Sequence, residues 1–189
     1  PKPKRSAIFL AVTAEEKGLL GSKHYTRSPL IPLSKTALNL NVDMILPLGV
    51  PESVVVTAAD RTTIWPTVKA AAEKNHLEIE VDQRAHLGIF YRSDHFSMAQ
   101  AGVPAFSVAA GMKITGKPTD FATKAHKDFN DKAYHSPQDE FQPDWDFSGF
   151  VVLAEFMLGV ARDVANSDQL PTWNVGDEFR LAREKCEAK

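Results

Sequence analysis

Short apolar runs alternate with helical patterns along this chain. Continuous or alternating apolar stretches predict strands over residues 6–12, 38–45, 52–59, 77–81 and 103–111. Helical spacing and boundary residues predict helices or turns over residues 18–26, 62–76, 93–102 and 144–166. Ser93 or Asp94 is expected to cap the third of these helices, and Asp144 or Asp146 lies near the start of the fourth. Strands that alternate with helices in this way predict an α/β sandwich.

The polar stretches predict the remaining parts of the chain. The first strand, SAIFLAV over residues 6–12, is expected to be buried in a mostly parallel sheet. Residues 113–134 are expected to form a polar loop. Residues 167–189 are expected to form a polar C-terminal tail that packs loosely, which leaves residues 1–166 as the domain.

Composition excludes several classes of protein. The 189 residues suit one domain, and 43% hydrophobic with 24% charged residues is typical of a globular protein. A formal net charge of −2 argues against a nucleic-acid partner, because a phosphate-binding surface needs a basic excess. No apolar run approaches the roughly 18 residues of a membrane span, and no signal peptide is visible. The single cysteine, Cys186, excludes an internal disulfide and a thiolate zinc site.

Candidate chemistry gathers where the predicted strands end. Glu15 and Glu16 follow the first strand, Asp43 lies near the end of the second, and His135 follows the loop after the last. Ligands of α/β sheets bind outside the carboxyl ends of the strands. Zinc accepts carboxylate oxygen and imidazole nitrogen, so Glu16, Asp43 and His135 are candidate zinc ligands. The alternatives are helix-capping or solvated carboxylates and a surface histidine.

Four stretches in order resemble one known family. They are AVTAEEKGLLGS, NVDMI, YRSDHFSMAQAGVPAF and YHSPQDE, and the resemblance covers about residues 4–165. They resemble the motifs of the M28 zinc metallopeptidases, the aminopeptidase and glutamate carboxypeptidase group. The resemblance implies a three-layer sandwich with a mixed, mostly parallel central sheet flanked by helices. It makes residues 1–166 a partial peptidase domain.

The resemblance also implies roles for the acidic and imidazole groups. The family uses two zinc ions bridged by one aspartate, with a water or hydroxide between them. Glu15 is then the general base, Glu16 and His135 hold one zinc, and Asp43 holds the other. Two cations explain how adjacent carboxylates can both stay charged, because cations lower the pKa of nearby carboxyl groups.

Further residues match the rim of such a site. Asp139 would orient the imidazole or serve as a turn residue, and Asp94 and His95 would support the ligands or line the substrate pocket, with helix capping by Asp94 as the alternative. Tyr91 would donate a hydrogen bond to an oxyanion, although the aminopeptidase branch carries the aromatic residue one position earlier. Arg92 would bind a substrate carboxylate or lie exposed.

Two expected ligands are missing from the pattern. The family places a histidine in an H-x-D segment and the bridging aspartate upstream of the glutamate pair, but the 14 residues before Glu15 contain neither residue type. The chain therefore resembles the C-terminal part of a peptidase domain, either as a truncated piece of a full enzyme, which we favour, or as a natural partial domain. On this expectation the fragment alone is inactive, and its exposed sheet edge favours self-association.

The sequence thus predicts a zinc-dependent exopeptidase, more specifically an aminopeptidase, that acts on peptide substrates. A carboxypeptidase and a glutaminyl cyclase with a single zinc remain open within the same fold. A non-catalytic, peptidase-like binding domain is the alternative from another class. Secretion or export to the periplasm is expected from the resemblance only.

Overall fold

A mixed sheet forms the centre of the molecule. The computed structural model describes residues 2–82 and 85–188. Its described strands form one four-stranded sheet in the order β1-β4-β2-β3. The strands are β1 (Asn39–Val42), β2 (Ser53–Thr57), β3 (Glu78–Glu80) and β4 (Ala105–Ala110). β1 is parallel to β4 and β3 is parallel to β2, whereas β2 and β4 are antiparallel.

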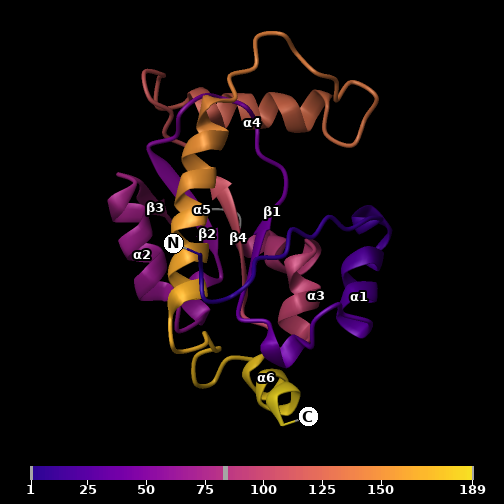
Figure 1. Cartoon of the computed structure of the whole chain (residues 1–189). Coiled ribbons are helices and arrows are strands. Elements are labelled where there is room, and N and C mark those ends of the chain that lie inside the picture. Colours follow the sequence, from indigo (N-terminus) through magenta and orange to yellow (C-terminus); the bar gives the residue numbers. More distant parts are fainter. Residues whose placement is uncertain (1, 83–84, 189) are drawn as a thin grey trace.

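Helices cover both faces of this sheet. They are α1 (Leu20–Arg27), α2 (Trp65–Lys74), α3 (His95–Gln100), α4 (Phe121–Lys132), α5 (Ser148–Asn166) and α6 (Arg180–Glu187). Short 3-10 turns connect them: η1 (Glu15–Lys17), η2 (Leu33–Lys35), η3 (Ala59–Arg61), η4 (Ala85–Leu87) and η5 (Ile89–Arg92). α2 and α5 pack together on one side of the sheet, and α3 packs on the other side with α1 beside it (Figure 1). The predicted α/β sandwich with a mixed sheet is therefore confirmed.

The central strand β4 divides the core into two clusters. Phe106 and Val108 belong to the cluster under α2 and α5, whereas Ala105 belongs to the cluster with α3. This alternation follows from the two-residue period of a strand. The second cluster also takes in Trp173 and Phe179 from the C-terminal segment. Both faces of the sheet are therefore buried by apolar side chains from helices.

The first predicted strand is wrong. Residues 6–12 are extended but pair with no strand among the described residues, and the exposed fractions of Ile8, Phe9 and Leu10 are 47%, 99% and 41%. The chain just before this run is attached to the end of α5, where the Arg5 amide donates to the carbonyl oxygen of Ala165 at 3.1 Å. A strand requires a partner for its backbone groups, and an apolar run does not supply one. The predicted burial therefore fails together with the predicted pairing.

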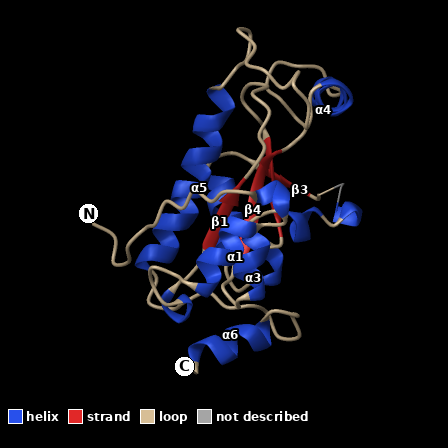
Figure 2. Ribbon diagram, turned by 90° about the vertical axis from the view of Figure 1, so that its right-hand side faces the viewer, coloured by secondary structure: helices blue, strands red, loops and turns tan. Residues whose placement is uncertain are grey.

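The predicted polar loop is also wrong in its second half, because residues 121–132 form α4. Three ion pairs with i,i+4 spacing lie on or at the start of this helix: Asp120 with Lys124, Lys127 with Asp131, and Asp128 with Lys132. Such pairs stabilise a helix that has little apolar surface. α4 lies at one end of the molecule and α6 at the other (Figures 1 and 2).

The C-terminal segment does not pack loosely. Trp173 and Arg183 are fully buried, and Phe179 is 6% exposed. Arg183 Nη1 donates to the carbonyl oxygens of Leu33 and Thr36, both at 3.1 Å. The prediction was wrong because it rested on the polar composition of the whole segment. The few large side chains in it enter the core and fix the segment there. No helix in the described part of the chain has the length and apolar character that a membrane crossing needs.

Candidate active site

The two adjacent glutamates lie in a tight turn and not in a strand. η1 is closed by the amide of Gly18, which donates to the carbonyl oxygen of Glu15 at 2.9 Å. Ala14 before this turn and Leu19 after it have φ values of 57° and 59°. Residues other than glycine seldom adopt this left-handed region, and such strain is often found at functional sites. The turn frees the two carboxylates from the strict up-and-down alternation of a strand.

Glu16 and His135 meet although they come from distant parts of the chain. Glu16 Oε1 lies 2.6 Å from His135 Nε2. The ring of Tyr134 stacks on the imidazole with a centroid separation of 3.8 Å, and His135 itself has a φ of 57°. The side chains of Glu16 and His135 are 65% and 49% exposed, so a ligand can reach the space beside them. This is the pair that the sequence predicts to share one metal; the sharing itself stays a prediction.

Glu15 lies among other charged groups. Partial burial raises the pKa of Glu15, and the carboxylates of Glu16, Asp43 and Asp94 raise it further, whereas His135 opposes them. These neighbours come from four separate segments of the chain, and their charges all act on Glu15. A raised pKa strengthens an ionised carboxylate as a proton acceptor, which suits a general base.

Asp43 is held by a short chain of hydrogen bonds. Ser93 Oγ donates to Asp43 Oδ2 at 2.7 Å, and Asn41 Nδ2 donates to Ser93 Oγ at 3.0 Å. Asp94 occupies the N-cap position of α3, one of the two residues predicted there, but its side chain makes no cap bond. The Ser93 hydroxyl is directed to Asp43 instead.

His95 is a buried neutral group beside this network. It is 1% exposed, and its ring packs against Phe90 with centroids 4.8 Å apart. Within the described structure neither ring nitrogen has a hydrogen-bond partner, and Asp94 Oδ1 also lacks one. Burial lowers the pKa of His95 to about 4, although the nearby Asp43 carboxylate acts in the opposite direction. His95 therefore contributes a buried, neutral ring that packs on Phe90 in the neighbourhood of Asp43.

Three other predicted residues have different surroundings. The Tyr91 hydroxyl donates to Glu178 Oε1 at 2.9 Å, a bond that raises the pKa of Tyr91. Its predicted role as an oxyanion donor finds no support in this contact. Arg92 and Asp139 are exposed, and among the described residues neither side chain forms a hydrogen bond or ion pair with Glu15, Glu16 or Asp43.

Sequence reasoning missed Asn41, the Ser93 hydroxyl and Glu178. A usable pattern existed for Asn41, because Asn41 and Asp43 are two residues apart and lie on one side of an extended segment. The sequence indicated Ser93 only as a helix cap. Glu178 lies outside every motif, and only the packing of the C-terminal segment brings it to Tyr91.

The side chains that meet at this site suit zinc in their chemistry but not in their number. Carboxylate oxygen and imidazole nitrogen suit zinc, and Glu16 and His135 supply one of each. A catalytic zinc takes about three ligands from the protein. Among the described residues, no three histidine, cysteine or acidic side chains gather closely enough to hold a metal ion. The chemistry of the pair therefore fits, and the number of ligands assembled here is smaller than a full site requires.

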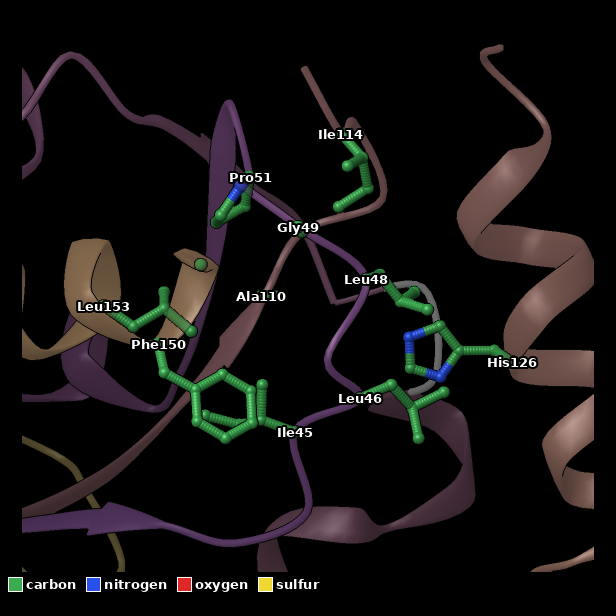
Figure 3. A pocket seen from close by; sticks show the side chains of 12 residues that line it. Ile45, Leu46, Leu48, Gly49, Pro51, Ala110, Ile114, His126, Phe150 and Leu153 are labelled. Atoms are coloured by element: carbon green, nitrogen blue, oxygen red, sulfur yellow. The ribbon is translucent and has the colours of Figure 1, made fainter. Parts of the chain in front are cut away.

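A small apolar cavity lies away from this chemistry. Its volume is about 10 Å³, room for about one water, and it lies between the loop after β1, α4 and the start of α5. Figure 3 shows the ring of His126 beside Leu46 and Leu48 at its edge. His126 begins the one H-x-D tripeptide of the sequence, residues 126–128. That tripeptide lies within α4 and is not among the charged groups that act on Glu15.

Comparison with known proteins identifies the family. The model of "Peptidase family M28" matches residues 1–171. Among solved structures, the chain is similar to the aminopeptidase from Aneurinibacillus sp. strain AM-1, with 20% identity and a TM-score of 0.53. That similarity covers 88% of this chain and 35% of the aminopeptidase, so the chain spans about a third of that protein's length. No curated protein matches the chain. Because the family model covers most of its length, the chain belongs to peptidase family M28.

Proposed function

We propose that this chain carries the general base and part of the metal site of a zinc-dependent exopeptidase. One observation carries the proposal: the 2.6 Å contact between Glu16 and His135, directly beside Glu15 with its raised pKa. Glu16 and His135 would hold one zinc ion and Asp43 the other. Zinc, when bound, supplies a water of lowered pKa and polarises the scissile carbonyl.

The chain's own residues supply the proton transfer. Glu15 would accept the proton from the attacking water, since it lies in the same turn as Glu16, which contacts His135. Ser93 and Asn41 fix the position of Asp43. The likeness in fold to an aminopeptidase is what favours action at the N-terminus of a peptide in this proposal.

The 189-residue chain alone is expected to be a poor enzyme. Its described residues bring only two candidate ligands into direct contact, and a catalytic zinc takes about three from the protein. We therefore propose weak zinc binding and slow hydrolysis for the isolated chain. Fast, zinc-dependent hydrolysis by the isolated chain, lost in Glu15→Gln, would show that these residues suffice.

A hydrolysis assay tests the function in the full-length protein that carries this sequence. The substrates are three versions of one peptide: with free termini, with an acetylated N-terminus and with an amidated C-terminus. An aminopeptidase cleaves the first and third and leaves the second intact. Glu15→Gln should lower kcat by about a hundredfold or more with little change in KM, because it removes the base and keeps the shape. Lys17→Gln, in the same turn, is the matched control.

A single-zinc glutaminyl cyclase is the second candidate. The Glu16–His135 contact fits one metal as well as two, since the described residues show one such pair. The cyclase would bind one zinc and release ammonia from an N-terminal glutamine. Metal analysis of the full-length protein and a glutaminyl peptide in the same assay separate the two activities.

A further inference from the structure

The C-terminal segment, residues 172–187, makes contacts that the proposed reaction does not use. It lies wholly beyond residues 1–171, which the family model matches. Trp173 is fully buried, and its Nε1 donates to the carbonyl oxygen of Gly102 at 3.1 Å. Arg180 Nη1 donates back to the carbonyl oxygen of Trp173 at 2.8 Å. The segment is thus fixed to the body of the molecule at the end of α3.

Arg61 joins this segment to the second core cluster. Its Nε binds Asp177 Oδ2 and its Nη2 binds Glu178 Oε1, both at 2.8 Å. Its guanidinium carbon lies 5.0 to 5.6 Å from the ring centroids of Phe90, Trp173 and Phe179. A planar guanidinium suits this arrangement, because it can stack on rings while its edge donates to two carboxylates.

The same segment holds η5. Glu178 Oε1 accepts the hydrogen bond from the Tyr91 hydroxyl at 2.9 Å as well as the one from Arg61. The ring of Phe179 lies 6.0 Å from that of Phe90 and 6.2 Å from that of Phe96. Two successive residues of the C-terminal segment therefore contact both side chains at the centre of η5.

η5 leads directly into the residue that holds Asp43. Ser93 follows Arg92, the last residue of η5, and its hydroxyl donates to Asp43 Oδ2 at 2.7 Å. A displacement of Phe90 and Tyr91 would move Ser93, since only Arg92 separates them along the chain. We propose that residues 172–187 form a clamp that positions Ser93 against Asp43, with Arg61, Glu178 and Tyr91 as its positioning residues. The importance of Asp43 in this inference rests on the proposed function.

Hydrogen exchange on the 189-residue chain tests the clamp without using activity. Glu178→Ala and Tyr91→Phe each remove the Tyr91–Glu178 bond. Both should speed exchange at the amides of Tyr91 and Phe96 by about tenfold and leave the amides of α5 unchanged. The double variant should exchange no faster than Glu178→Ala, because both changes remove the same bond. Glu73→Ala is the matched control, since Glu73 is an exposed glutamate on α2, outside the clamp.

Two results would overturn the clamp. One is unchanged exchange at Tyr91 and Phe96 in Glu178→Ala. The other is equal acceleration throughout α5, which would indicate general destabilisation. Calorimetry with Zn²⁺ alone adds a second readout on the full-length protein: zinc affinity should fall several-fold in Glu178→Ala and stay unchanged in Glu73→Ala. If Asp43→Asn leaves zinc binding unaltered, the proposed metal role fails, and the exchange result still decides whether the clamp exists.

Discussion

Glu15 and Glu16 are neighbours in sequence with different surroundings. Glu16 contacts His135, whereas partial burial and, after it, the charges of other carboxylates raise the pKa of Glu15. The sequence predicted two separate roles from the adjacent pair, and the 3-10 turn of η1 shows how one short segment can direct two side chains differently. The sequence did not indicate how Asp43 is held in place, because the hydrogen bond to it comes from Ser93, fifty positions further along the chain.

His95 gives a prediction at the scale of one residue. Burial lowers its pKa from 6.5 to about 4, so the unfolded chain binds a proton in this range and the folded chain does not. Folding stability should therefore fall as the pH drops from about 6.5 to about 4, by roughly 3 kcal/mol from this group. Urea unfolding at several pH values measures the effect. His95→Gln should flatten the slope, whereas His24→Gln, at an exposed position, should leave it unchanged.

At the scale of elements, the apolar patterns predicted the positions of most strands and helices well. They did not predict which segments pair with one another. β1, β2, β3, β4, α2 and α5 lie where the hydrophobic patterns placed them. The composition of residues 6–12 predicts a strand, but a strand forms only where another segment lies beside it to pair with its backbone. The polar segment that forms α4 was expected to be a loop, but i,i+4 ion pairs of Asp and Lys stabilise the helix. This charge pattern is visible in the sequence.

Gly102 gives a prediction at this scale, because it allows α6 to approach the end of α3. Its φ is 90°, and an added Cβ would lie 2.5 Å from the backbone nitrogen of Arg183. Gly102→Ala should destabilise the fold by about 3 kcal/mol or more, from backbone strain and from the clash. Gly116→Ala is the control, since Gly116 has a φ of 72° with open space around it. It should cost only about 1 kcal/mol. Equal losses in thermal unfolding would argue against close packing of α6.

At the scale of the whole molecule, an exposed apolar segment lies outside the two core clusters. Phe9 is 99% exposed and Ile8 and Leu10 are about half exposed, while Val42 of the edge strand β1 is 43% exposed. Scattered apolar side chains are normal on a surface, but a continuous exposed run favours association. The sequence-based expectation of self-association stays a prediction, and this segment is where we place it.

Sedimentation velocity tests this expectation. The 189-residue chain should associate in a concentration-dependent manner, and Phe9→Asp should weaken that association by about tenfold or more, because it removes a large apolar contact and adds a charge. Val175→Asp is the matched control at another nearly fully exposed apolar position, 90% exposed. A chain that stays monomeric at all concentrations, or an equal effect of both variants, would contradict this assignment.

Zinc binding by Glu16 and His135 is the most direct test of the central claim. In calorimetry with Zn²⁺ on the full-length protein, Glu16→Gln and His135→Gln should each weaken zinc binding by about tenfold or more, because each removes a ligand. Glu15→Gln and His24→Gln should keep it, since Glu15 is assigned to the water and His24 is exposed elsewhere on α1. Unchanged zinc affinity in both Glu16→Gln and His135→Gln would contradict the account.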